Sequence, residues 1–345
     1  MKKWILILCA MLSFNAKAAS DCADGEQNCW DCGKTASDLC TARRIGEQLQ
    51  ITGSGEMRDY EFYRDLAYNS EESSEPINSP HGPYNGPWGF GETNVPWGYD
   101  YTSVSVEGVK NIGEYAFDYA SVKTAEISDT VTSLGASAFD SCYSLKDVRL
   151  SNALTSIGDY AFGWAAHPDF GDENLPMINL VIPSSVGSIG ENAFFQTYTN
   201  SLVIEGTPDI ADNAFSYLGK VGGKELNVKI YCLDASVCEN KGQGEAVSVV
   251  EYTKNPDTGL YQTSDGKLFA TADLMVYGAA CADEAQCKDI LAAANTGQPF
   301  RVGSKFYRSL EDFAKGNRIN KRIYSVEEAT AVSKPTGNTF KLRYK

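Results

Sequence analysis

The feature that most constrains this chain is a block of residues that recurs along its middle. In each copy an alternating apolar pair is followed by polar residues, an Ile or Leu, and an Ala-Phe dipeptide. The Ile or Leu always lies five residues before the phenylalanine, and successive phenylalanines are 22, 23, 32 and 21 residues apart. They are Phe117, Phe139, Phe162, Phe194 and Phe215. A fixed register of this kind is typical of solenoids, in which each copy covers the apolar side of the next.

Each copy has a simple physical interpretation. Alternating apolar residues predict a short strand with one buried face, and the Ala-Phe dipeptide is expected on a short helical turn with its ring inside the stack. The rings of successive copies should then form an interior ladder. The alternating pairs are Val104/Val106, Ala125/Ile127, Val148/Leu150, Leu180/Ile182, Leu202/Ile204 and, without a complete block after it, Val228/Ile230.

The residues between the buried positions should point outward and form a second ladder. Such an extended row of side chains is the predicted ligand-binding face, because repeat surfaces commonly recognise other proteins. The row is Ser105, Glu126, Arg149, Val181, Val203 and Lys229, flanked by Glu107, Ser128, Ser151, Glu205 and Tyr231. The residues predicted to contact a ligand on this face are Ser105, Glu107, Glu126, Arg149, Lys229 and Tyr231.

Two copies carry a family resemblance. "LVIPSSVGSIGENAFFQT" from Leu180 and "SLGASAFDSCYSLKDVRL" from Ser133 resemble the BspA-type, or Treponema-type, leucine-rich repeats of bacterial surface proteins. The resemblance covers residues 101–231 closely and places Cys142 at the cysteine position of the family motif. It implies an α/β repeat solenoid of about five repeats of 21–23 residues. It also implies an adhesin-like protein that binds host matrix proteins or other bacteria.

The N-terminus has the pattern of a secretory signal peptide over residues 1–18. Lys2 and Lys3 precede an apolar run, Trp4 to Phe14, which is too short to span a bilayer. Ala16-Lys17-Ala18 is a small-x-small cleavage site. We therefore expect a bacterial protein that is exported to the periplasm, the cell surface or the medium, without a transmembrane segment.

Cysteine spacing predicts covalent caps at both ends of the repeats. In an oxidising compartment, close cysteines favour disulfides. Residues 19–48 are expected to form a cap with two disulfides, although zinc is an alternative for its four cysteines. Two further pairs, each six residues apart, predict the disulfides Cys232–Cys238 and Cys281–Cys287. The four N-terminal cysteines are Cys22, Cys29, Cys32 and Cys40.

The remaining segments divide the chain further. Residues 49–100 hold a leader strand and a Pro/Gly/aromatic loop, which either provides binding anchors or packs over the first repeat. Its candidate aromatic residues are Tyr84, Trp88, Phe90 and Trp97. Residues 101–232 are the repeats, 233–300 a C-terminal cap with a hairpin and a helix, and 301–345 a basic α+β tail. The long step between Phe162 and Phe194 contains an insertion of about ten residues near Trp164–Met177.

Charge and residue types favour a binding protein over an enzyme. The formal net charge of −15 repels phosphates, which argues against a nucleic-acid partner. Only His81 and His167 are present, and no hydrolase, zinc-protease or phosphate-binding motif occurs. We expect no catalytic residues, no cofactor and no metal, and a protein or glycan as the partner. The alternative function is a structural or glycan-binding envelope protein that uses the aromatic loop 84–99.

Overall fold

The computed structural model describes residues 21–23, 26–60, 95–167, 177–221, 224–296, 300–302, 305–307 and 309–314. The chain divides into two compact units, Met1–Lys288 and Asp289–Lys345. The predicted signal peptide, Tyr84, Trp88, Phe90, most of the insertion after His167 and the tail beyond residue 314 lie outside the described residues.

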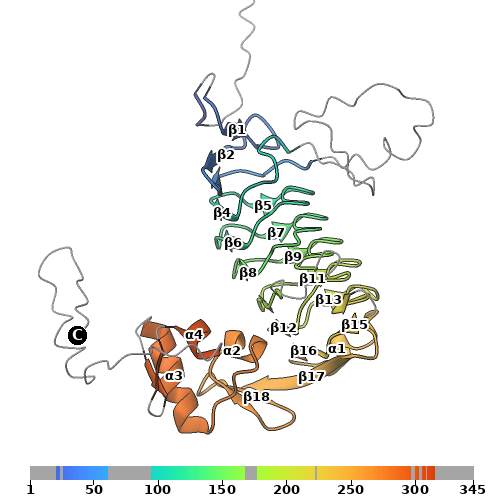
Figure 1. The fold of residues 1–345 in the computed structure, drawn as a ribbon, viewed down its shortest axis with the longest axis vertical. Coiled ribbons are helices and arrows are strands. Elements are labelled where there is room, and N and C mark those ends of the chain that lie inside the picture. The colour runs from blue at the N-terminus through green and yellow to red at the C-terminus, as the bar shows by residue number, and fades with distance from the viewer. Residues whose placement is uncertain are drawn as a thin grey trace, which may run out of the picture. The chain divides into compact units, whose positions relative to one another are not determined.

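The first unit contains a stack of parallel strands with two walls (Figure 1). One wall is the sheet β13-β11-β9-β7-β5, with one two-residue strand from each repeat. The other wall carries the alternating pairs and is split into a sheet ending at β8 and a sheet beginning at β10. The first wall comprises β5 (Asn111–Ile112), β7 (Ser133–Leu134), β9 (Ser156–Ile157), β11 (Ser188–Ile189) and β13 (Asp209–Ile210).

The second wall continues beyond the repeats at both ends. Its first sheet has the order β1-β2-β3-β4-β6-β8, and its second has the order β10-β12-β16-β17-β18-β19. The first comprises β1 (Cys29–Asp31), β2 (Cys40–Ile45), β3 (Gln48–Gly53), β4 (Ser103–Glu107), β6 (Thr124–Ile127) and β8 (Asp147–Arg149). The second comprises β10 (Leu180–Ile182), β12 (Ser201–Ile204), β16 (Val228–Cys232), β17 (Val247–Lys254), β18 (Tyr261–Thr263) and β19 (Leu268–Phe269). The expected repeat solenoid is confirmed.

The Ala-Phe segments, expected on short helical turns, form a third wall of hydrogen-bonded turns. Alternate residues bond within their own turn, as when the N–H of Asp118 donates to the carbonyl of Tyr115 at 3.3 Å. The residues between them donate to the next repeat, as when the N–H of Phe117 donates to the carbonyl of Ala138 at 2.9 Å. A regular helix would pair all of these backbone N–H and carbonyl groups within one repeat. In the turns, half of the N–H groups donate to the next repeat instead and so join neighbouring repeats.

This turn wall has a left-handed backbone at repeated positions, two residues before the phenylalanine in the first four repeats and two residues after it in all five. These residues have φ between 50° and 57°. The conformation costs most L-residues about 1–2 kcal/mol, and Gly or Asn adopts it more readily. The residues are Tyr115, Tyr119, Ser137, Ser141, Tyr160, Trp164, Asn192, Gln196 and Tyr217. Aromatic residues are therefore frequent where the backbone disfavours them.

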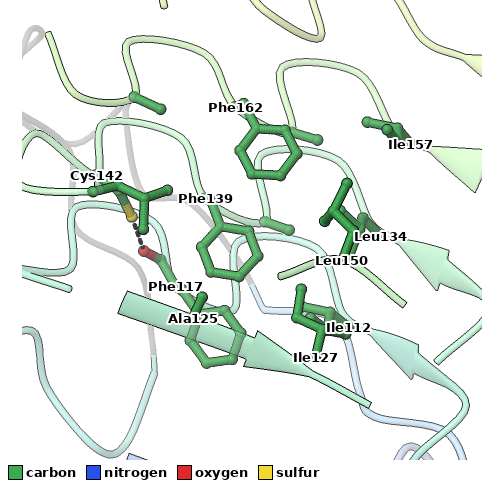
Figure 2. Packing of buried hydrophobic residues seen from close by; sticks show 14 of the residues in the cluster. Ile112, Phe117, Ala125, Ile127, Leu134, Phe139, Cys142, Leu150, Ile157 and Phe162 are labelled. Atoms are coloured by element: carbon green, nitrogen blue, oxygen red, sulfur yellow. Dashed lines mark hydrogen bonds between the residues drawn. The ribbon is translucent and has the colours of Figure 1, made fainter. Parts of the chain in front are cut away.

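The five repeat phenylalanines form the interior ladder, and Figure 2 shows the first three, Phe117, Phe139 and Phe162. All five side chains are fully buried. Ring centroids lie 5.0 Å apart for Phe117–Phe139, 5.6 Å for Phe139–Phe162, 5.6 Å for Phe162–Phe194 and 5.8 Å for Phe194–Phe215. The preceding Ile or Leu of each repeat is buried beside its ring. The long insertion therefore does not interrupt the ladder between Phe162 and Phe194.

Cys142 belongs to this core. Its thiol is fully buried and donates a hydrogen bond to the carbonyl of Phe117 at 3.0 Å. Thr197 occupies the equivalent position in repeat four, three residues after the phenylalanine. Its hydroxyl donates to the carbonyl of Phe162 at 2.6 Å. Burial raises the pKa of the Cys142 thiol, which keeps it protonated. Cys142 is thus a structural donor between neighbouring turns.

Two neighbouring turns carry carboxyl groups that influence each other electrostatically. Asp118 and Asp140 directly follow Phe117 and Phe139, and Asp118 is only 1% exposed. Burial and the neighbouring Asp140 carboxyl raise the pKa of Asp118 well above its ordinary value. The folded state therefore binds this proton more tightly than the unfolded chain does.

The raised pKa predicts that Asp118→Asn is more stable than the wild type at neutral pH. The stabilising proton is fully bound below the unfolded pKa of about 3.9, and its contribution is lost as pH rises through the higher folded value. The gain should thus disappear in acid, which urea unfolding at several pH values will measure. Asp129→Asn is the contrasting variant, because hydrogen bonds from Asn152 lower the pKa of this exposed carboxyl. A neutral-pH gain that persists unchanged in acid would contradict the prediction.

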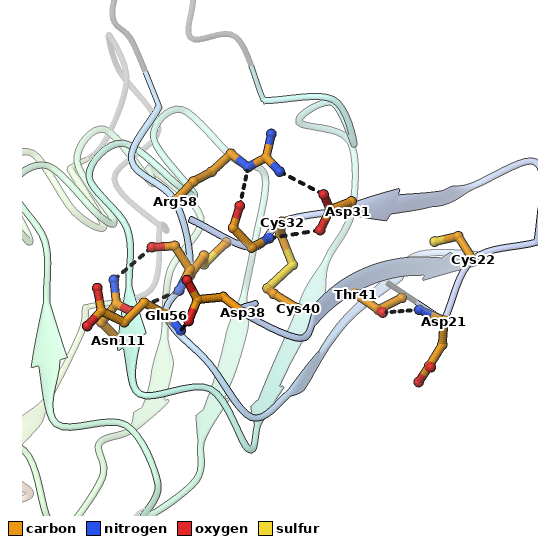
Figure 3. Close-up of a disulfide and its surroundings, with 12 residues drawn as sticks. Asp21, Cys22, Asp31, Cys32, Asp38, Cys40, Thr41, Glu56, Arg58 and Asn111 are labelled. Atoms are coloured by element: carbon orange, nitrogen blue, oxygen red, sulfur yellow. Dashed lines mark hydrogen bonds and ion pairs between the residues drawn. A yellow bond between two sulfur atoms is a disulfide. The ribbon is translucent and has the colours of Figure 1, made fainter. Parts of the chain in front are cut away.

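The N-terminal cap covers the first end of the stack (Figure 3). β1 and β2 pair antiparallel, β2 pairs antiparallel with β3, and β3 starts the parallel stack on β4. Disulfides join Cys22 to Cys29 and Cys32 to Cys40, so the zinc alternative does not hold. Arg58 donates from Nη2 to the Asp31 carboxylate at 3.0 Å and from Nε to the carbonyl of Gly33. These bonds attach the cap to the chain that leads into the repeats.

The C-terminal part of the first unit extends the stack. β16 and β17 pair parallel, and the chain then forms the predicted hairpin about Asp265-Gly266 between β18 and β19. Cys232 is joined to Cys238 in helix α1 (Ala235–Cys238), and Cys281 to Cys287. Helix α2 (Ala272–Val276) follows the hairpin, and β14 (Lys220–Val221) and β15 (Lys224–Glu225) form a small ribbon.

The second unit is small. Helix α3 (Glu284–Thr296) crosses the boundary between the units, and its residues from Asp289 onward belong to the second unit. The antiparallel strands β20 (Phe300–Val302) and β21 (Lys305–Tyr307) form a hairpin. Ser309 caps the N-terminus of helix α4 (Leu310–Ala314), because its hydroxyl accepts a hydrogen bond from the N–H of Asp312 at 3.1 Å.

Candidate functional site

Strand pairing places the first half of the predicted ligand-binding face in register. Gln50, Ser105, Glu126 and Arg149 are direct neighbours across β3, β4, β6 and β8. Thr52 lies opposite Glu107 in the adjoining outward row. We call these six residues the open row. The buried pairs alternate with them, except that Val148 is only half-buried.

The open row is polar and accessible. Thr52, Glu107, Glu126 and Arg149 are exposed, whereas Gln50 and Ser105 are half-buried. Glu126 and Arg149 have opposite charges on neighbouring strands, an arrangement that favours the sheet modestly. Because the backbone of the stack holds these side chains, the row presents a fixed pattern of charge and hydrogen-bonding groups.

The second half of the predicted face is covered by the chain itself. Val203 is fully buried and Tyr231 is 4% exposed, although both were expected to point into solvent. Helix α2 packs on β10 and β12, and all four residues of β12 are buried. The ring of Phe269 lies 6.4 Å from the ring of Tyr231. Tyr231 is thus a contact for the C-terminal cap and not an open ligand-binding residue.

The register also corrects the position of Lys229. Val203 lies opposite Tyr231, and Lys229 lies opposite Ser201, so Tyr231 continues the outward row. The pairs equivalent to Leu202/Ile204 are therefore Ile230/Cys232 and not Val228/Ile230. No complete repeat block follows β16, so its sequence carries no fixed distance to a later phenylalanine from which the register can be counted. Ser151, which was expected beside the row, is also buried.

Specific hydrogen bonds attach the C-terminal cap to β12 and to Glu205, the residue that follows it. The hydroxyl of Ser201 donates to the carbonyl of Val276 in α2, and the hydroxyl of Tyr252 donates to the carbonyl of Ile204 at 3.0 Å. Tyr261 donates its hydroxyl to the carboxylate of Glu205. The ammonium of Lys254 lies 3.5 Å from the same carboxylate. Glu205, a predicted flanking residue, therefore binds the chain's own cap.

Electrostatics mark the boundary between the open and covered halves. Burial and the Glu205 carboxylate raise the pKa of Asp273 in α2, whereas the Arg149 guanidinium opposes this shift. The Arg149 guanidinium therefore acts on the Asp273 carboxyl of α2, although the Arg149 side chain is exposed. The open row ends at this residue.

The aromatic loop does not supply Trp97 to a binding surface. Trp97 is 1% exposed, and its ring lies 5.1 Å from the ring of Tyr60 in the core of the first unit. It packs over the start of the repeats, as the lid interpretation expected. Tyr84, Trp88 and Phe90 lie outside the described residues, so the proposed role of the loop in glycan binding stays a prediction.

Chemistry-bearing residues are sparse in the part of the chain that the structure describes. There, no group of three or more His, Cys, Asp or Glu side chains is arranged to hold a metal ion. His167 packs edge-on against Trp164 with ring centroids 4.9 Å apart. Among the same residues, no helix has the length and apolar character needed to cross a bilayer.

One sequence signal indicates the covered half in hindsight. Val181 and Val203 are apolar at outward positions where β4, β6 and β8 have Ser105, Glu126 and Arg149. A strand that is apolar on both sides is typical of a sheet covered on both faces. This change of pattern identifies β10 and β12 as covered, but not the segment that covers them.

A match to a protein-family model agrees with the repeat geometry. The description "BspA type Leucine rich repeat region" matches residues 101–167 and 168–240 in six copies, one more than the blocks counted in the sequence. A crystal structure of a leucine-rich repeat protein from Eubacterium ventriosum is 17% identical, with a TM-score of 0.39 over 68% of this chain and 48% of that chain. The search of curated proteins finds no match. Residues 101–240 of this chain therefore match the model of the BspA-type leucine-rich-repeat family.

Proposed function

We propose that this chain is an exported bacterial binding protein that recognises another protein through the open row, in an adhesin-like role. Host matrix proteins and bacterial surface proteins are the partner classes that the resemblance suggests. The accessibility of the open row carries the proposal. In the same wall, the equivalent Val203 and Tyr231 are buried under the C-terminal cap and Val181 is half-buried.

Physical arguments support protein recognition over catalysis. Extended repeat surfaces with fixed side chains commonly bind proteins, and a row that contains both signs of charge can select a partner by electrostatic complementarity. The family and its fold are typical of non-enzymatic binding domains. Among the described residues, no group of three or more His, Cys, Asp or Glu side chains is arranged to hold a metal ion.

Charge reversal in the open row tests this proposal. Arg149→Glu should weaken binding of a matrix protein identified in a panel screen by about tenfold, equivalent to about 1.4 kcal/mol. The reason is that a like charge then faces Glu126 and any acidic group of the partner. Surface plasmon resonance on the chain from residue 19 onward will measure the affinity.

The control is Lys110→Glu, the same charge reversal at an exposed residue between β4 and β5. Unchanged affinity in Arg149→Glu would contradict recognition through the open row. Loss of glycan binding in Trp88→Ala, with Arg149→Glu unaffected, would instead favour the glycan-binding alternative.

A further inference from the structure

A second surface stands out on the turn wall, away from the outward strand face. Four aromatic side chains from repeats three to five contact one another there. Phe195 lies at the centre, with ring centroids 6.0 Å from Tyr160, 5.8 Å from Trp164 and 5.5 Å from Tyr217. Tyr160 is 37% exposed and Tyr217 is 52% exposed. We call these four residues the aromatic ladder.

Folding alone does not explain the aromatic ladder. Tyr160, Trp164 and Tyr217 have φ of 53°, 54° and 57°, the left-handed conformation that bulky residues disfavour. At the position equivalent to Tyr160, repeat four has Asn192, a residue that tolerates this backbone well. Because Tyr160 and Tyr217 are exposed, they recover only part of this cost, through their contacts with Phe195 and, for Tyr160, a hydrogen bond from the Asn192 amide to its hydroxyl. Bulky exposed residues kept at strained backbone positions are a reason to look for a function.

The electrostatic surroundings of the aromatic ladder favour a cation. Each of the three repeats has an exposed carboxylate three residues before its phenylalanine, namely Asp159, Glu191 and Asp212. Aromatic faces attract cations, and adjacent carboxylates strengthen the attraction.

The chain itself already uses these groups in this way. The ammonium of Lys220 lies 5.8 Å from the centroid of the Tyr217 ring, and the ammonium of Lys241 lies 3.1 Å from the Asp212 carboxylate. A hollow of about 310 Å³ adjoins this end of the ladder and is lined in part by Tyr217, Lys220 and Glu225. A side chain of an incoming partner can therefore be accommodated beside the last ring.

We infer that the aromatic ladder is a second binding site, which takes a Lys- or Arg-bearing segment of a partner protein. The relative tilt of the rings favours this partner over a glycan. Neighbouring rings are inclined by 54° to 69°, so they offer no common plane along which successive sugar rings can stack. A cation needs only one ring face, and separate side chains can use separate rings. The inference does not depend on the open row.

The test uses substitutions that preserve both the net charge and the backbone conformation. The double variant Tyr160→Asn/Tyr217→Asn places at position 160 the residue type that repeat four already has there, Asn192, and at position 217 a residue that also tolerates the left-handed backbone. Fluorescence anisotropy with a labelled oligo-arginine peptide should show binding to the chain from residue 19 onward, and about tenfold weaker binding to the variant. Its thermal midpoint should be unchanged or higher, because Asn adopts this conformation more easily.

Matched controls separate the possible outcomes. Ser137→Asn/Gln196→Asn alters two other left-handed positions without removing a ring and should leave peptide binding unchanged. Arg149→Glu should also leave it unchanged, which distinguishes this site from the open row. Equal peptide binding by the wild type and the tyrosine variant would show attraction by the general acidic charge and overturn the inference. Absence of wild-type peptide binding, or loss of only a neutral glycan ligand in the variant, would overturn it as well.

Discussion

Phe139→Ala is expected to lower the free energy of unfolding by about 3–5 kcal/mol, the cost of emptying a phenylalanine site in a close-packed core. Phe139 is fully buried, and its ring is packed between those of Phe117 and Phe162 at 5.0 and 5.6 Å. The cavity cannot close easily, because backbone hydrogen bonds hold each turn to both of its neighbours. The loss therefore weakens two repeat interfaces at once.

Urea unfolding followed by circular dichroism will measure this effect. Leu39→Ala is the control, because the Leu39 side chain is 45% exposed and should contribute no more than about 0.5 kcal/mol. A cost below about 1 kcal/mol for Phe139→Ala would mean that the rings do not form a shared core.

The second large effect is expected from adding a single methyl group between repeats. Gly158→Ala should destabilise the protein by about 1–3 kcal/mol through overpacking. A Cβ atom at Gly158 would lie 2.7 Å from the backbone nitrogen of Ala136 and 2.7 Å from the carbonyl carbon of Gly135. Both obstacles are backbone atoms of the preceding repeat, which cannot rotate away, so the two repeats must separate slightly.

Gly187→Ala provides a matched control in the next repeat. There the nearest atom to an added Cβ is the carbonyl oxygen of Thr155, at 3.6 Å, an ordinary contact. Its thermal midpoint should equal or exceed that of the wild type, since alanine restricts the unfolded chain. Ala211, at the glycine position of the fifth repeat, indicates that the end of the array has more freedom to adjust. Equal midpoints for Gly158→Ala and Gly187→Ala would contradict the argument about close backbone approach.

The interior of the repeats could be predicted from the sequence because it depends on short, constant spacings. The distance of five residues from Ile or Leu to Phe places both side chains inside the same repeat, and five copies specify the ladder from Phe117 to Phe215. The same alternation predicts the open row at Ser105, Glu126 and Arg149. The Ala-Phe turns were interpreted as helical because their backbone bonds to the next repeat leave no periodic signal.

The amino-acid sequence by itself determined which residues face the interior, because that choice is made within each repeat of about 22 residues. Only the tertiary structure decided which part of the outward face is accessible. The hydrogen bond from Ser201 to the carbonyl of Val276 spans 75 residues, and the contact between Phe269 and Tyr231 is also non-local. Such contacts depend on how the C-terminal chain returns over β10, β12 and β16. The physical reason is that burial by a distant segment has no local periodicity.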